Sequence, residues 1–164
     1  PTDVGLIECH ATGTPVGDRV EFDSLRELWG ESGWSPGQCV IGSVKSTVGH
    51  LLTGAGAAGL AKVLLAMKAE QLPPQANFAR PIDGLNDGAC PFRVLGAPAR
   101  WSRPSAAPRR AAVSGFGFGG VNAHLLVEEW TGVLPRPGPP RGGVPKLVAA
   151  GAGTGAPTSR AAEP

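Results

Sequence analysis

The sequence predicts a layered α/β domain, and three observations carry this prediction. A β-branched run over residues 39–44 is typical of a buried strand, and a loop links it to the segment 52–67, where Lys62 is the only charged residue. A helix that is apolar on nearly all sides must be covered on nearly all sides. We therefore place this helix at the centre of the domain. A strand–helix unit precedes it and a pair of strands follows it.

The first strand–helix unit occupies residues 4–30. Residues 4–9 alternate and run apolar, which predicts a short strand ending at His10, and residues 11–17 have loop composition. Asp18 followed three residues later by Glu21 resembles a capping box. The apolar residues that follow fall at helical spacing: Phe22, Leu25, Leu28 and Trp29. These signals predict a helix from residue 18 to about Gly30.

The second half of the chain predicts a hairpin. The two prolines after Leu72 end helical structure, and residues 75–91 carry turn formers that suit a surface path. Residues 92–94 predict a short edge strand. A glycine-rich link then joins two further strands, 111–114 and 124–128. The predicted order is β-α-β-α-(β)-β-β.

Composition separates the chain into a domain and a linker. With 41% hydrophobic residues, 17% charged residues and a formal charge of +2, it matches a soluble globular protein and neither a nucleic-acid binder nor a disordered chain. From Thr131 onward, fourteen of thirty-four residues are proline or glycine, which is linker composition. We expect a domain over 1–130 and a disordered linker over 131–164. Five arginines and no acid lie in 93–110, which indicates either a solvated loop or a docking patch for an acidic partner.

The three cysteines, Cys9, Cys39 and Cys90, are odd in number and widely spaced, without a C-x-x-C pair. This spacing argues against a zinc site and a disulfide framework and suits a reducing compartment. We find no signal peptide, and the apolar run 52–67 is too short to span a bilayer. We therefore expect a cytoplasmic protein with no membrane segment and no metal site.

Lys45 and His50 fall at the predicted strand-to-helix turn, beside the positive end of the helix dipole. An imidazole there should resist protonation and act as a neutral donor, although it would serve equally well as a turn cap. Residues 54–59 match G-x-G-x-x-G literally. About ten residues separate them from the strand, however, and prolines occupy the expected second strand, so close helix packing explains them better than a dinucleotide.

Two further segments have both a functional and a structural interpretation. The glycine-rich loop 115–120 could present backbone N–H groups to an anion, or it could be a tight hairpin with two core phenylalanines. His10 ends a strand, where a histidine often bonds only to backbone. Taken alone, neither segment distinguishes the functional interpretation from the structural one.

Three motifs taken together are more specific than any one of them alone. Residues 7–14 (IECHATGT), 42–50 (GSVKSTVGH) and 115–124 (GFGFGGVNAH) occur in an order and at separations that resemble the C-terminal half of β-ketoacyl synthases. The ketosynthase domains of type I polyketide and polyunsaturated fatty acid synthases are the nearest in pattern. The resemblance covers roughly residues 4–129. It implies a thiolase-like fold, of which this chain would be the C-terminal half (β-α-β-α-β-β), layered α/β/α.

The resemblance also implies a reaction, the decarboxylative Claisen condensation of an acyl thioester with a malonyl-type extender. By position, His10 and His50 resemble the two imidazole donors that stabilise the enolate, and Lys45 the lysine that supplies positive charge. The family binds no cofactor directly, because phosphopantetheine arrives on an acyl carrier protein. A carrier protein and a second copy in a homodimer are therefore implied partners.

The remaining implied site residues would hold the substrate. Thr12 and Thr14 resemble the hydroxyls that hold the pantetheine arm. Phe118 resembles a gate whose N–H forms half of an oxyanion hole, and Phe116 and Gly119 lie beside it in the same substrate-binding loop.

The chain departs from the family pattern in one important respect. The nucleophilic cysteine belongs to the family's N-terminal half, so we expect the chain alone to be inactive and to need that half as a partner. Three milder departures are Ala11, Thr47 and Gly59, where the family usually has Gly, Asn and, in discrete bacterial enzymes, Glu. Two alternatives stay open: a non-condensing relative, such as a chain-length-factor-like or decarboxylase-only domain, and a non-catalytic half-domain that binds carrier protein.

Overall fold

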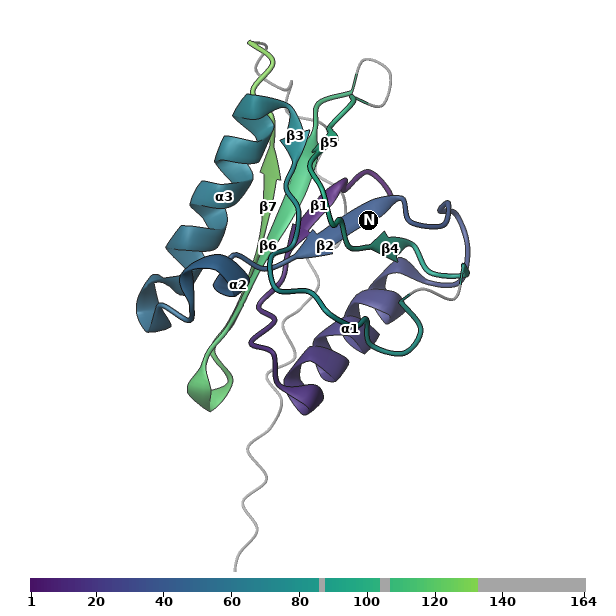
Figure 1. Ribbon diagram of the computed structural model, residues 1–164. Helices are drawn as coiled ribbons and strands as arrows, with labels where there is room; N and C mark the ends of the chain where they lie inside the picture. The colour runs from purple at the N-terminus through teal and green to yellow at the C-terminus, as the bar shows by residue number, and fades with distance from the viewer. Residues whose placement is uncertain (86–87, 104–106, 133–164) are drawn as a thin grey trace, which may run out of the picture. The chain divides into compact units, whose positions relative to one another are not determined.

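The computed structural model describes residues 1–85, 88–103 and 107–132 (Figure 1). The main elements are β1 (Leu6–Glu8), α1 (Pro15–Trp29), β2 (Cys39–Gly42), α2 (Lys45–Val48), α3 (Ala55–Ala69), β4 (Phe92–Arg93), β6 (Arg110–Phe116) and β7 (Asn122–Glu128). Two short strands, β3 (Gln71–Leu72) and β5 (Ala99–Arg100), and two 3₁₀ turns, Leu52–Gly54 and Phe118–Gly120, complete the set. The linker predicted from residue 131 lies outside the described residues from 133 onward.

A five-stranded sheet in the order β4-β2-β1-β6-β7 forms the middle layer. The pairs β4–β2, β2–β1 and β1–β6 are parallel, whereas β7 returns antiparallel to β6 as a hairpin. Figure 1 shows α1 and α3 on opposite sides of this sheet. The predicted α/β/α layering and the thiolase-like half are confirmed.

Each face of the sheet has its own apolar core, because successive residues of a strand point to opposite faces. Ile7 faces α1 and belongs to the cluster that includes Phe22 and Phe92. Leu6 faces α3 and belongs to the cluster that includes Val63. The strand prediction for residues 4–9 is thus confirmed in kind, with the hydrogen-bonded part shortened to β1.

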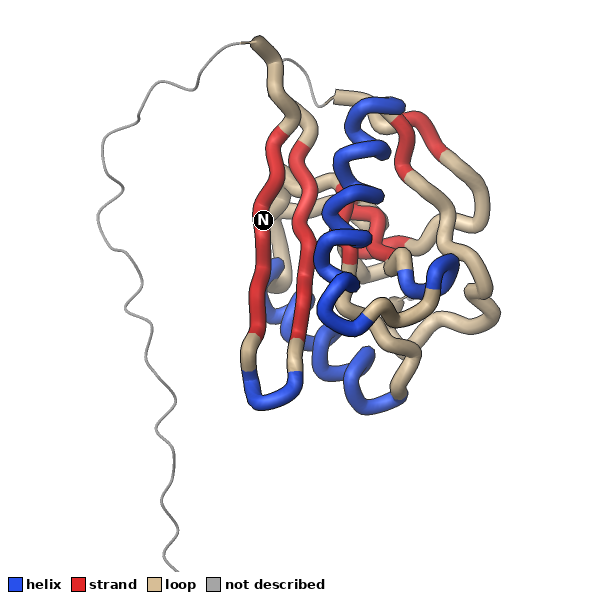
Figure 2. The backbone as a smooth tube through the Cα atoms, turned by 90° about the vertical axis from the view of Figure 1, so that its left-hand side faces the viewer, coloured by secondary structure: helices blue, strands red, loops and turns tan. Residues whose placement is uncertain are grey.

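Helix α3 is less covered than its composition predicts. Its buried side is a narrow stripe, and Leu64 and Leu65 on the other side are 50% and 64% exposed. The described part of this chain covers only one face of the helix. The helix therefore does not lie at the centre of the domain, where its composition predicts it. By length and composition the segment Leu52–Ala69 would also be long enough to cross a membrane, contrary to the length estimate above. In this fold it packs against the sheet, beside the hairpin strands (Figure 2).

Two local predictions are wrong. Helix α1 begins at Pro15, with Thr14 at the N-cap, because proline is well suited to the first helical position. Asp18 lies inside the helix and accepts a hydrogen bond from the Gly13 N–H at 3.2 Å. Residues 45–48, predicted as loop, form the single helical turn α2.

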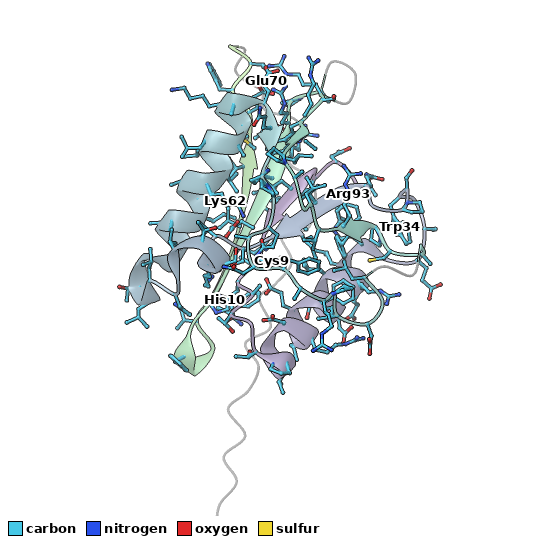
Figure 3. The ribbon with its side chains drawn as sticks, in the orientation of Figure 1. Cys9, His10, Trp34, Lys62, Glu70 and Arg93 are labelled. Carbon is cyan, nitrogen blue, oxygen red and sulfur yellow. The ribbon has the colours of Figure 1, made fainter. Side chains whose placement is uncertain are left out.

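The arginine run is only partly solvated: Arg93 and Arg100 are exposed, whereas the other three arginines form ion pairs. Arg109 is buried and pairs with Glu70 and Glu129 at 2.9 and 2.6 Å. Arg103 also binds Glu129 through two hydrogen bonds, which lower the pKa of that carboxyl to about 2. Arg110 pairs with Glu128 across the hairpin. Arg109 therefore fastens the hairpin to Glu70 at the end of α3 (labelled in Figure 3), whereas Arg110 bridges the two hairpin strands.

Candidate functional site

Three of the predicted site segments meet at one edge of the sheet. Strands β1, β2 and β6 are parallel, so His10, the turn before Lys45 and Phe116 all follow or end strands at their carboxyl ends. Ligands of open α/β sheets bind at this edge. The topology therefore gathers residues that lie more than a hundred positions apart in the sequence.

The two predicted donor histidines lie side by side. The ring centroids of His10 and His50 are 5.7 Å apart, with the ring planes at 82°. Phe116 packs against His10 at 5.4 Å between centroids. His50 is placed by α2, which ends at Gly49, where φ is +76°. That left-handed conformation favours glycine and turns the chain toward His10.

Glu21 holds the segment that carries His10. Its two carboxylate oxygens accept hydrogen bonds from the backbone N–H groups of His10 and Ala11, both at 2.8 Å. Burial raises the pKa of Glu21, while these two hydrogen bonds oppose that rise. This role replaces the capping box predicted for Glu21. The signal present in the sequence is its place four residues before Leu25, which puts an acid on the buried stripe of α1.

The hydrogen bond to His50 selects one tautomer. The Leu52 N–H donates to His50 Nδ1 at 3.1 Å, which requires Nδ1 to be unprotonated. The proton of the neutral ring then resides on Nε2, where it can be donated to a ligand. This is the arrangement that a neutral donor needs.

His10 is kept neutral by its surroundings. Burial lowers its pKa below the ordinary value, and the positive charge of Lys45 and the neighbouring His50 lower it further. Lys45 begins α2, so its charge acts on the site from the same turn that leads to His50. Near neutral pH His10 therefore presents an uncharged imidazole to the site.

The predicted substrate-binding residues divide into two groups. The hydroxyls of Thr12 and Thr14 lie 3.2 Å apart in the loop before α1, and Thr12 and Lys45 both line a cavity of about 580 Å³. Phe118 is fully exposed at the tip of the hairpin, where Gly119 has a φ of +79°. The structure thus does not bring Phe118 onto the histidine pair.

The remaining histidine and the three cysteines lie in surroundings that suit a structural role. His124 pairs with Ser114 across the hairpin at 3.0 Å. All three cysteines are buried, and burial raises the pKa of Cys9 and of Cys39, which disfavours the thiolate that a nucleophile requires. Figure 3 shows Cys9 beside His10 at the end of β1. No group of three or more His, Cys, Asp or Glu side chains suited to a metal ion occurs among the described residues.

Known proteins are similar to this chain in sequence. Residues 1–79 match the family described as "Beta-ketoacyl synthase, C-terminal domain". The chain is 42% identical over 137 residues to a polyunsaturated fatty acid synthase polypeptide of Thraustochytrium sp., covering 79% of this chain and 5% of that protein. It is 44% identical over 131 residues to polyketide synthase ThaG of Burkholderia thailandensis, covering 79% of this chain and 2% of that protein.

A solved structure agrees. The ketosynthase from module 6 of the bacillaene synthase of Bacillus subtilis 168 superposes with a TM-score of 0.75 at 39% identity, covering 79% of this chain and 23% of that one. The chain therefore spans a small part of each relative and aligns over most of its own length. It is the C-terminal portion of a ketosynthase domain of the β-ketoacyl synthase family.

Proposed function

We propose that the complete protein is an acyltransferase that performs decarboxylative Claisen condensation, and that this chain supplies its decarboxylation half-site. The observation that supports this most directly is the pair of adjacent imidazoles, His10 and His50, with ring centroids 5.7 Å apart. Such a pair can donate two hydrogen bonds to one oxygen.

The chemistry makes use of these donors. The carbon–carboxylate bond of the extender breaks, carbon dioxide leaves, and the electron pair of that bond passes into an enolate whose charge lies on the thioester oxygen. Donors aimed at an oxygen where charge develops stabilise the transition state. The enolate carbon then attacks the acyl thioester held on a cysteine of the N-terminal half, and the cysteine leaves as thiolate.

The partners follow from the same proposal. The extender arrives on the phosphopantetheine arm of an acyl carrier protein, and Thr12 and Thr14 would bind that arm beside the cavity. The N-terminal half would cover the apolar side of α3, where Leu64 and Leu65 are exposed, because apolar patches of this kind mark interaction surfaces. The complete enzyme would act as a cytoplasmic homodimer.

The test uses the complete synthase and its carrier protein. Acylation of the enzyme by an acyl thioester and release of carbon dioxide from the extender are measured separately. A condensing enzyme performs both. A chain-length-factor-like or decarboxylase-only relative would release carbon dioxide without becoming acylated. A carrier-binding half-domain would do neither and would still bind the carrier.

Replacing Lys45 by methionine should move the acid limb of the decarboxylation rate to higher pH. The charge of Lys45 lowers the pKa of His10, so without it His10 gains a proton at a higher pH and the neutral donor is lost earlier as the pH falls. Burial still acts on His10, so the shift is partial. The pH profile of carbon dioxide release measures it. Lys68→Met, on the exposed end of α3, is the matched control, and an unmoved acid limb in Lys45→Met would contradict this role.

Replacing Phe118 by alanine should change acyl loading and chain-length selectivity more than decarboxylation. The ring is fully exposed at the hairpin tip and carries no charge, so its loss removes a gate and no donor. Phe116→Ala should do the opposite, because the ring of Phe116 packs against His10. Acyl occupancy by mass spectrometry and carbon dioxide release distinguish the two. Equal losses of both activities in Phe118→Ala would identify it as a packing residue.

A further inference from the structure

A buried ion pair lies beneath the turn that carries Lys45 and leads to His50. Glu8, the last residue of β1, is 2% exposed, and its Oε2 is 2.7 Å from the ammonium of Lys62 on α3. Its other oxygen, Oε1, accepts a hydrogen bond from the Val44 N–H at 2.6 Å. Figure 3 shows Lys62 on the side of α3 that faces the sheet. One carboxylate thus joins a strand, a helix and the start of α2.

The packing around this carboxylate leaves room only for a glycine on the helix. A Cβ atom added at Gly59 would lie 2.9 Å from Glu8 Cγ, a distance that real contacts avoid. Gly59 is three residues before Lys62, on the same face of α3. The absence of a side chain at 59 lets α3 approach β1 closely enough for Lys62 to reach Glu8.

The turn itself is held almost entirely through its backbone. Gln75 accepts from the Ser43 N–H at 2.8 Å and donates to the Ser43 carbonyl at 3.3 Å. Asn77 donates to the Ser46 carbonyl at 2.8 Å. Glu8 accepts a hydrogen bond from the N–H of Val44, the residue between Ser43 and Lys45. The side chains that hold this turn come from distant segments, and Glu8 brings the negative charge.

We propose that Glu8 is a positioning residue for the Lys45–His50 turn, with Lys62 as its buried counter-ion. This inference rests on the proposed function. The bond from the Val44 N–H to Glu8 sets where α2 begins, and α2 sets the place of Lys45 and, through Gly49, of His50. Lys62 neutralises the charge of Glu8 at a place where an unpaired carboxylate would be costly. Glu8 touches no reacting atom and acts through the turn.

The physical argument separates positioning from stability. Replacing a buried ion pair by apolar side chains of similar volume is often neutral for stability. Stability alone therefore does not require the pair, whereas positioning requires an acceptor for the Val44 N–H. Two double variants differ in whether they keep that acceptor: Glu8→Leu/Lys62→Met removes it, and Glu8→Gln/Lys62→Met keeps it.

The experiment compares both double variants with the wild-type synthase. Thermal unfolding checks the fold, and kcat and KM are measured for carbon dioxide release from the carrier-bound extender. Because an error of about 1 Å in placement can cost about 100-fold, we expect Glu8→Leu/Lys62→Met to lose about 10- to 100-fold in kcat with KM within about twofold of wild type. Glu8→Gln/Lys62→Met should keep kcat within about threefold, since the glutamine oxygen still accepts from Val44 N–H.

Each outcome bears on a different claim. Equal kcat in the two double variants would overturn the positioning role and leave only packing. A loss of more than about tenfold in a folded Glu8→Gln/Lys62→Met would also overturn it, because the charge and not the acceptor would then matter. That variant alone decides the question if the leucine variant does not fold. A wild-type synthase that releases no carbon dioxide would instead refute the proposed function.

Discussion

Replacing either His10 or His50 by alanine in the complete synthase should lower the rate of extender decarboxylation about a hundredfold or more. Each imidazole supplies one hydrogen bond to the same developing oxyanion, and the loss of one such donor costs about 3–4 kcal/mol in the transition state. Acylation of the cysteine forms no enolate, so it should fall less. Separate assays of acyl transfer and carbon dioxide release measure the difference.

The chain contains its own control for this experiment. His124 is the third histidine, bound to Ser114 on the hairpin, and His124→Ala should leave decarboxylation near the wild-type rate. The two site histidines should also differ from each other. His50 is fixed as a donor by the Leu52 N–H, whereas His10 stays neutral through its burial and the charge of Lys45. A His50→Ala enzyme that decarboxylates at the wild-type rate would show that this histidine only holds its turn.

The order of the long elements could be predicted because it depends on local pattern. Alternation in residues 4–9, helical spacing after Glu21 and the apolar run of α3 each lie within one segment. The short elements could not be predicted in this way. Helix α2 has four residues, too few for a period. Strands β3 and β5 have two residues each and exist only because they pair with one another.

The residues of the candidate site likewise divide into those that the sequence could predict and those that it could not. The histidines and Lys45 are recognisable because they belong to contiguous motifs. Glu8 and Glu21 act on backbone amides in other segments, 36 and about 10 positions away, and no local pattern reports such a contact. Both carboxylates are nearly completely buried, and in each case the role becomes visible only when the folded chain brings the amide to the acid.

Helix α3 shows a third kind of limit. Its composition predicts a helix that is covered on most sides, but the described residues cover one side. Composition predicts that an apolar surface is buried, but it does not predict which segment or chain covers that surface. The exposed Leu64 and Leu65 are therefore informative about a partner surface, as proposed above for the N-terminal half.

Replacing Arg109 by methionine should lower the free energy of unfolding of the complete ketosynthase domain by about 1–3 kcal/mol, the cost of leaving a buried hydrogen-bond acceptor without its donor. Arg109 is 3% exposed and binds Glu70, Glu129 and the Trp101 carbonyl at 2.9, 2.6 and 2.6 Å. Its loss leaves the Trp101 carbonyl without this donor and releases the end of α3 from the hairpin. Urea unfolding followed by tryptophan fluorescence measures the change.

The adjacent residue is the matched control. Arg110 pairs with Glu128 and Asp3, but these carboxylates and the guanidinium are all substantially exposed, and exposed pairs contribute about 0–1 kcal/mol. Arg110→Met should therefore shift the unfolding midpoint little. Because the pKa of Glu129 is lowered to about 2, first by its hydrogen bonds with Arg103, that carboxylate stays ionised across the neutral and mildly acidic range. The difference between the two variants should consequently persist from neutral pH down to mildly acidic pH. Equal destabilisation by the two substitutions would mean that the buried cluster contributes no more than a surface pair.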